Sequence, residues 1–206
     1  MPQTQTCTNN NPVHHTWNGC VGSRKPVVDL NVTASFSTPI PGLIDTWCNA
    51  PLVRLTMDTS AIKAQVDGLW ANGETYIAAG LMWGWRVLTP LPPFADGVGA
   101  STNPPTRKIM VLMTDGENTK SQIDTNHEGG DTVASDAAMA SLCTSIKADN
   151  IDLYMIAFTV TNATTKARLQ ACASDVGHFY DAADGPALQH AFQQIGGSLV
   201  KLSLSR

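Results

Sequence analysis

The sequence predicts an α/β fold in which a doubly wound, mostly parallel sheet follows an irregular N-terminal insertion. From residue 108 onward, apolar strand-like runs alternate with amphipathic helical runs, an order typical of parallel strands joined by helical crossovers. Two of these runs, 108–113 and 153–160, are apolar at most positions, as strands covered on both faces are. Residues 1–50 keep neither a helical nor a strand period. We therefore divide the 206 residues into an insertion, 1–50, and an α/β region, 51–206.

The insertion has the composition of a long loop. Asparagine and proline interrupt it repeatedly, from the run 9–12 through Pro26 to Pro41. It also holds three of the five cysteines: Cys7, Cys20 and Cys48. A disulfide between two of them would staple this segment in an oxidising compartment.

Two helices are expected between the insertion and the first long strand. A short strand at 51–56 precedes Asp58, which can cap the first helix. The apolar face of that helix consists of Ile62, Val66, Leu69 and Trp70, and Asn72-Gly73 ends it. The second helix begins at Thr75 and stops before Pro90, with an apolar face of Ile77, Leu81, Trp85 and Leu88. Helical spacing places both Trp70 and Trp85 in the core.

The remaining elements alternate in type along the chain. The strand 108–113 is followed by a polar loop to about residue 131, and the strand 153–160 and a short strand at 178–180 come later. A helix lies between each strand and the next, and a last one begins near Pro186. The residues expected on their buried faces are Met139, Leu142, Cys143 and Ile146, then Leu169, Cys172 and Ala173, then Leu188, Phe192, Ile195 and Leu199.

Composition argues against several classes of function. The net charge is −4 and no basic stripe is visible, so we expect no nucleic-acid partner. No apolar run approaches the roughly 18 residues of a membrane span. The N-terminus lacks the basic start and apolar core of a signal peptide, and we expect the chain to be part of a longer protein. No catalytic motif is found, so we expect a protein that is not an enzyme.

Two polar residues stand at positions suited to chemistry. Asp115 follows a buried strand, where ligands of open α/β sheets bind, and its carboxylate suits a hard divalent cation or an Asx turn. Thr75 opens a helix, where its hydroxyl could cap that helix or ligate a cation, and capping is favoured on local grounds.

Two short motifs stand in order along the chain: Gly73-Glu74-Thr75 before a helix and Thr114-Asp115-Gly116 after a buried strand. Together they resemble the second and third motifs of a von Willebrand factor A-like domain. A longer ordered set comprises 17–21, Arg24, Cys48, 80–90, 113–118, 169–173, Leu188 and 191–192. This set most closely resembles the TadG-like proteins of Tad-type (Flp) pilus assembly.

The resemblance implies a metal-ion-dependent adhesion site that holds Mg²⁺ or Mn²⁺. Thr75 matches its second element and Asp115 its third, whereas the first, Asp-x-Ser-x-Ser, is absent. The string Asp58-Thr59-Ser60 has one serine too few and is interpreted as a helix cap. The family's first strand is expected upstream, which would leave the strand 108–113 with a bare edge. Two protein oxygens plus water would make a weak site, or none in this chain.

The resemblance also implies a role and a location. The role is that of a non-catalytic module that binds a protein partner in pilus or envelope assembly. The location is the periplasmic or cell-surface side of a bacterial membrane, with an inner-membrane anchor upstream. Two alternatives remain: a metal-dependent hydrolase that uses Asp115 and Glu117 with His127 or His178, and a metal-silent structural scaffold.

The cysteines suggest two disulfides. Cys143 and Cys172 lie on the core-side faces of consecutive helices, which makes a bond between them plausible. Cys20 and Cys48 are then the second pair, with Cys7 left over. Buried free thiols are the alternative. Closing a loop of about 30 residues would stabilise the fold by roughly 3–4 kcal/mol.

Overall fold

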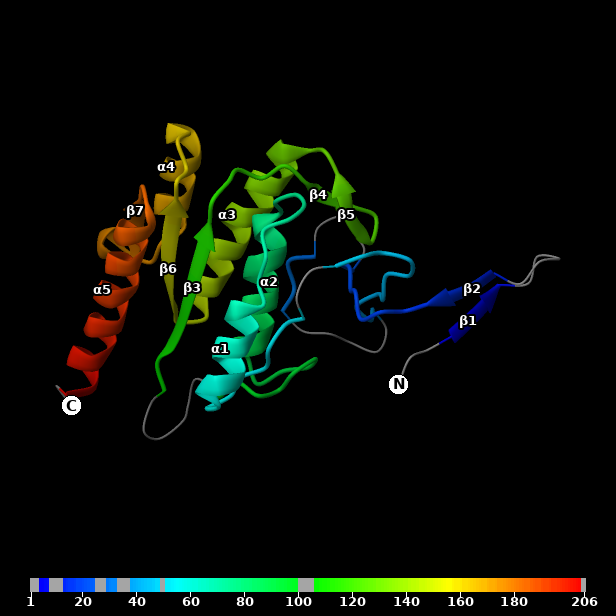
Figure 1. The fold of residues 1–206 in the computed structure, drawn as a ribbon, viewed down its shortest axis with the longest axis horizontal. Helices are drawn as coiled ribbons and strands as arrows, with labels where there is room; N and C mark the ends of the chain where they lie inside the picture. Colours follow the sequence, from blue (N-terminus) through cyan, green and yellow to red (C-terminus); the bar gives the residue numbers. More distant parts are fainter. Residues whose placement is uncertain are drawn as a thin grey trace.

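The chain builds a three-stranded parallel sheet with helices on both faces (Figure 1). The computed structural model describes residues 4–7, 13–24, 29–32, 38–48, 51–99 and 106–204. The insertion residues 9–12 and Pro26 lie outside these ranges. In order, the elements are β1 (Thr4–Cys7), β2 (Val13–Thr16), α1 (Thr59–Asp67), α2 (Ile77–Leu88), β3 (Lys108–Thr114), β4 (Ser121–Ile123), β5 (Asn126–Gly129), α3 (Thr132–Ala148), β6 (Ile151–Phe158), α4 (Ala163–Cys172), a 3₁₀ turn (Val176–His178), β7 (Phe179–Ala182) and α5 (Gly185–Leu204).

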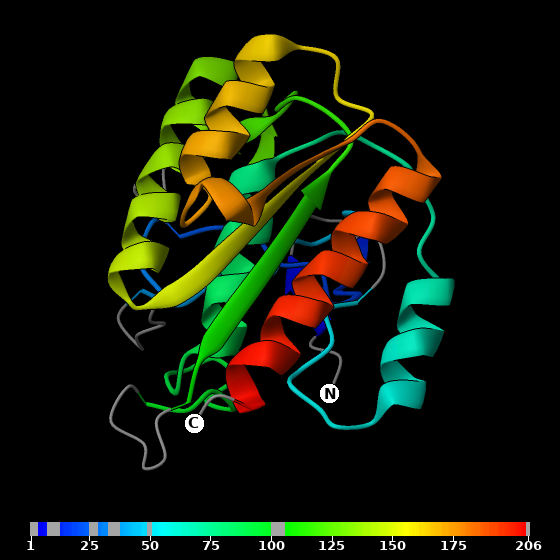
Figure 2. The same cartoon turned by 90° about the vertical axis from the view of Figure 1, so that its left-hand side faces the viewer.

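The sheet confirms the predicted α/β class. Its strand order is β3-β6-β7, and both pairings are parallel, from Lys108 opposite Ile151 to Phe158 opposite Ala182. Helices α2, α3 and α4 cover one face, and α5 covers the other (Figure 2). Because β6 is central, its even and odd side chains are both buried, as its apolar sequence predicted.

Two clusters of apolar side chains form the core. The larger joins α2, α3 and α4 to one sheet face and includes Leu81, Leu142 and Leu153, which are fully or almost fully buried. The smaller places Tyr154 and Ile156 of β6 against Ala191 and Ile195 of α5. Phe192, expected in the buried face of α5, is instead 48% exposed, because the helix turns Ala191 and Ile195 to the sheet.

Strand β3 stands at an edge of this sheet. Among the described strands it pairs only with β6, in agreement with the bare edge expected from the sequence. On the α5 side of β3, Val111 and Met113 are 39% and 49% exposed. Their neighbour Met110, which points to the opposite face, is buried against α2 and α3. One face of β3 is therefore covered, whereas the other is open near the carboxyl end of the strand.

Helix α1 forms where predicted but buries none of its residues. Asp58 caps it, because its carboxylate accepts from the amides of Ser60 and Ala61. The helix ends at Gly68, earlier than Asn72-Gly73, and the expected strand at 51–56 is irregular. Val66 and Trp70 are each 58% exposed, so the expectation that Trp70 packs in the core is wrong. Figure 2 shows α1 standing apart from the sheet.

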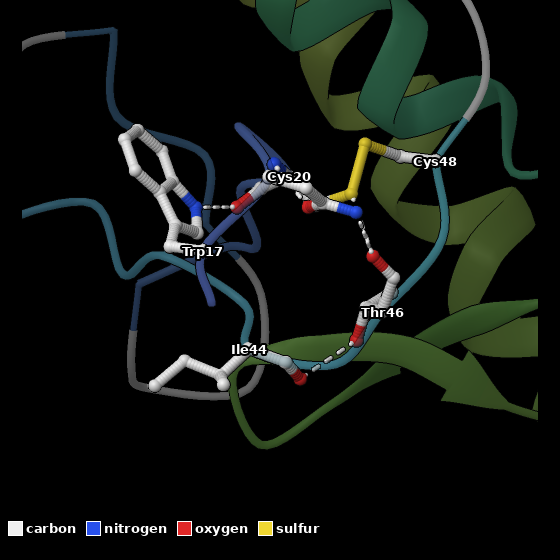
Figure 3. Close-up of a disulfide and its surroundings, with 6 residues drawn as sticks. Trp17, Cys20, Ile44, Thr46 and Cys48 are labelled. Carbon is white, nitrogen blue, oxygen red and sulfur yellow. Dashed lines mark hydrogen bonds between the residues drawn. A yellow bond between two sulfur atoms is a disulfide. The ribbon is translucent and has the colours of Figure 1, made fainter. Parts of the chain in front are cut away.

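The insertion is more ordered than its sequence predicted. Strands β1 and β2 form an antiparallel hairpin, from Thr4 opposite Thr16 to Cys7 opposite Val13, that lies far from the sheet (Figure 1). Farther along, a disulfide joins Cys20 to Cys48, and the Trp17 indole donates to the Cys20 carbonyl (Figure 3). A second disulfide joins Cys143 of α3 to Cys172 of α4. Both are the pairs expected from the sequence; the Cys7 side chain lies outside the described residues.

A buried charge cluster attaches the insertion to the helical layer. Arg24, Asp29 and Arg86 form ion pairs in which the side chains are at most 7% exposed. Burial raises the pKa of the Asp29 carboxyl, but the hydrogen bonds from Arg24 and Arg86 and the charge of Arg86 outweigh that effect and hold the pKa below its ordinary value. Gln122 of β4 extends the cluster by accepting from the Asp29 amide and donating to the Arg24 carbonyl.

In the described part of the chain, no helix is long and apolar enough to cross a membrane.

Candidate functional site

The structure places the loops that carry Thr75 and Asp115 side by side, although 40 residues separate the two residues in sequence. Asp115 follows β3 directly, and Gly116 then turns the chain toward the start of α2. A methyl group added to Gly116 would lie 3.6 Å from the Thr75 hydroxyl oxygen. The two polar residues thus belong to adjoining loops at the carboxyl end of the edge strand, where open α/β sheets bind ligands.

Backbone hydrogen bonds join these two loops. The amides of Thr119 and Lys120 both donate to the Thr75 carbonyl, at 2.9 and 3.0 Å. In return, the Thr75 amide donates to the Thr119 hydroxyl at 2.8 Å. The loop 73–76 is consequently held to the loop 114–120 through several contacts, and the separation of Thr75 from Asp115 is set by the backbone.

Asp115 offers a carboxylate that faces solvent. Its side chain is exposed, as is that of Glu117. The local turn is made by the preceding residue instead, because the Thr114 hydroxyl accepts from the Gly116 amide and donates to the Gly116 carbonyl. Among the described residues no hydrogen bond closes an Asx turn at Asp115, and its side chain is accessible from solvent.

Thr75 does not cap α2. No side chain caps the helix from its N-cap residue, Tyr76; the Ile77 amide instead donates to the Asn118 side-chain oxygen at 2.8 Å. The capping interpretation favoured from the local sequence is therefore wrong. Asn118 was missed as a site residue, because its partner amide lies 41 positions earlier and no local pattern joins them.

The two side chains are of a chemical type that a hard cation accepts. The Thr75 hydroxyl and the Asp115 carboxylate are oxygen ligands of the kind that Mg²⁺ and Mn²⁺ accept, with water filling the remaining positions. Across the described ranges, no three His, Cys, Asp or Glu side chains gather closely enough to hold a metal together. Asp58 caps α1 through its carboxylate, in agreement with the interpretation of the string at 58–60 as a helix cap.

Neither histidine considered for a hydrolase contacts Asp115. The His127 ring bonds the Ser23 hydroxyl at 2.8 Å and packs against Tyr76, with ring centroids 5.1 Å apart. Burial lowers the pKa of His127 below 6.5, and the nearby charge of Arg86 lowers it further against the opposing effect of Glu128. His178 stacks on Tyr154, one strand away from β3. This arrangement does not favour acid–base chemistry at Asp115.

A small cavity lies beneath the insertion. It is lined by Ser23 and Asp29 of the insertion and by Tyr76 and Met82 near and on α2, among others. Its volume of about 10 Å³ is barely sufficient for one water molecule. The cavity is therefore too small for an organic substrate, and the exposed loops around Thr75 and Asp115 are the better candidate site.

Comparison with known proteins identifies a similar fold. No protein-family model matches the chain, and no curated protein sequence matches it significantly. Among solved structures, the chain is similar to the pilus adhesin SpaC from Lactobacillus rhamnosus GG, with a TM-score of 0.51 and 15% sequence identity. The match covers 69% of this chain and 21% of the adhesin. At this identity the similarity concerns the fold, and the chain spans about a fifth of the adhesin's length.

Proposed function

We propose that this chain is a non-catalytic protein-binding module of a pilus assembly protein of the TadG-like, Tad/Flp type. It engages its partner through a partial metal-ion-dependent adhesion site formed by Thr75 and Asp115. The observation that carries the proposal is the close approach of the Gly116 backbone to the Thr75 hydroxyl, while the preceding residue, Asp115, is exposed. The similarity of the fold to a pilus adhesin supports it.

In this proposal Thr75 and Asp115 hold Mg²⁺ or Mn²⁺, and the cation supplies a positive charge that attracts a carboxylate of the partner protein. The residues of this chain orient the ligands. The Thr119 and Lys120 amides fix the Thr75 loop, and the Thr114 hydroxyl shapes the turn that presents Asp115. With two protein ligands, affinity for the cation alone is weak, and the partner's carboxylate strengthens it.

The proposed location is the periplasmic or cell-surface side of a bacterial membrane, with an anchor in upstream sequence. Two disulfides in a chain of this size are typical of oxidising compartments. The partner is a pilus or envelope protein, and no nucleic acid is involved.

The test is a thermal melt of the chain in EDTA and then in excess Mn²⁺ or Mg²⁺. A cation at ten times its dissociation constant stabilises the native state by about 1.4 kcal/mol, which raises the melting temperature by roughly 3–6 °C. Asp115→Ala should abolish the shift. Asp67→Ala removes an exposed carboxylate on α1, away from the site, and should leave the shift intact.

Two results would change the proposal. A cooperative melt without any cation shift would favour the metal-silent scaffold. Hydrolysis of a test ester or phosphoester that requires Asp115, Glu117 and a metal would favour the hydrolase. The second result is not expected, because the described contacts of His127 and His178 lead to Ser23, Tyr76 and Tyr154.

A further inference from the structure

Asn118 connects the candidate site to the helical layer. Its side chain is 7% exposed, although it follows two exposed positions of the site loop, Asp115 and Glu117, within three residues. A buried amide must satisfy its hydrogen-bonding groups within the protein. Its hydrogen bonds therefore show which elements this part of the loop contacts.

The oxygen and the nitrogen of the Asn118 side-chain amide each form a hydrogen bond with a different helix. Its oxygen accepts from the Ile77 amide, the first helical residue of α2, at 2.8 Å. Its nitrogen donates to the Asp136 carboxylate on α3 at 2.9 Å. The amide oxygen faces a backbone N–H donor, and the amide nitrogen faces a carboxylate acceptor. Both bonds can form in only one orientation of the amide.

Asp136 extends the connection to another helix. Its second oxygen pairs with Arg168 of α4 at 2.7 Å, so the carboxylate is shared between Asn118 and Arg168. A hydrogen bond to an ionised carboxylate is stronger than one between neutral groups. Asn118 is therefore tied to α2 directly, and to α3 and α4 through Asp136.

We propose that Asn118 is a positioning residue that holds the Asp115 loop and the Thr75 loop in register. Thr75 lies two residues before Ile77, and Asp115 three residues before Asn118, so the Asn118–Ile77 bond fixes the loops close to both candidate ligands. The significance of this role rests on the proposed function of the Thr75–Asp115 site. The role itself can be tested without any cation.

Amide hydrogen exchange at Thr119 and Lys120 provides the test, because these amides bond to the Thr75 carbonyl and not to Asn118. In Asn118→Ala both should exchange about tenfold faster than in the parent protein, since losing the bonds of Asn118 frees the loops to separate. Asn162→Ala is the matched control. It removes an asparagine cap from α4, and with it bonds to the Thr164 and Thr165 amides, far along the chain from the site loops.

Protection of Thr119 and Lys120 that survives in Asn118→Ala would overturn the proposal and leave Asn118 as a simple helix cap. Equal loss of protection in Asn162→Ala would also overturn it, because the effect would then be global. A second pair of variants keeps the test decisive if Asn118→Ala does not fold. Asn118→Asp places a carboxylate against Asp136 and should lose protection, whereas Asn118→Asp combined with Asp136→Asn restores a donor–acceptor pair and should recover it.

The cation melt separates this inference from the proposed function. If Asn118→Ala loses the Mn²⁺ shift and its amide protection together, while Asn162→Ala keeps both, positioning and cation binding are both supported. A parent protein without any Mn²⁺ shift would contradict the cation site alone, and the exchange rates at Thr119 and Lys120 would still decide the role of Asn118. If the double variant does not recover the protection of Thr119 and Lys120, the Asn118–Asp136 contact is not what positions the two loops.

Discussion

The N-terminal third of the molecule and the remainder differ in how far their described apolar side chains are buried. From Ile77 onward, the core consists of apolar residues such as Leu81, Leu142 and Ile156. In residues 13–72, the buried side chains include Ser23, Arg24 and Asp29, whereas the apolar residues of 44–70 face solvent. Trp47 and Trp70, for example, are 59% and 58% exposed and meet only edge to face.

This difference shows that the two parts are stabilised by different interactions. The C-terminal part folds because apolar surface leaves water, which contributes about 25 cal/mol for each Å². The N-terminal part is cross-linked internally by the Cys20–Cys48 disulfide and the Arg24–Asp29 ion pair, and the buried ion pair of Asp29 with Arg86 attaches it to α2. A buried charge contributes favourably only while all its partners remain, so this attachment should be sensitive to single changes.

The largest effect is expected from Asp29→Ala. This change leaves two buried arginines without their shared counter-ion and should lower the free energy of unfolding by roughly 3–5 kcal/mol. Denaturant unfolding measures the loss. Asp96→Ala is the control, because it also removes an aspartate paired with an arginine. Its partner Arg54 is 61% exposed and Asp96 itself 23%, so the change should cost much less. Similar losses in both variants would mean that the buried cluster does not attach the insertion.

A pair of apolar truncations compares the two parts directly. Leu153→Ala, at a fully buried position of β6, should cost about 2–5 kcal/mol through lost burial and the cavity left behind. Val66→Ala on the exposed face of α1 should change stability by no more than about 0.5 kcal/mol. Denaturant midpoints measure both. A large loss for Val66→Ala would show that something covers α1 in solution and would break the comparison.

The same contrast explains what the sequence could predict. The spacing of Leu142, Cys143 and Ile146 placed them correctly on the buried face of α3, and the alternation of elements predicted the parallel sheet. Equal spacing in α1 predicted a shared face for Ile62 and Val66, and that face exists. Periodicity states which residues lie together but not whether another element covers them, and so the burial of α1 was wrongly expected.

Polar residues at the site were harder to predict because their partners are distant in sequence. Thr75 and Asp115 were found from motifs, and the backbone does bring their loops together. Asn118 was not found, since its partners are at 77 and 136. The β4–β5 hairpin was likewise expected as a loop. A signal was present in Asp124, which adopts a φ of 55° at the hairpin turn, a conformation that aspartate tolerates better than most residues.

A smaller, pH-dependent effect is expected at the contact between the two parts. His127 of β5 bonds Ser23 of the insertion, and its pKa in the native state lies below 6.5. The unfolded chain therefore binds a proton more readily, so stability should fall as the pH drops through about 6.5, until the native imidazole also becomes protonated. His127→Asn cannot titrate and should flatten this part of the profile of melting temperature against pH. His190→Asn, on the exposed side of α5, should keep the slope, and a slope unchanged in His127→Asn would contradict the assignment.

The smallest change in stability is expected at the open side of β3. Apolar side chains are exposed there, as they are in the N-terminal third. Met113 is 49% exposed beside an edge that has no partner among the described strands, so Met113→Lys should alter the free energy of unfolding by no more than about 0.5 kcal/mol. A charge on an apolar edge strand also opposes strand-to-strand association, so the variant should aggregate more slowly on heating, as light scattering would measure. Met110→Lys is the matched control on the same strand: its side chain is 7% exposed against α2 and α3, and an unpaired charge there should prevent stable folding. If Met113→Lys is as damaging as Met110→Lys, this face of β3 is covered in solution, and the exposed apolar surface of the N-terminal third would need the same explanation.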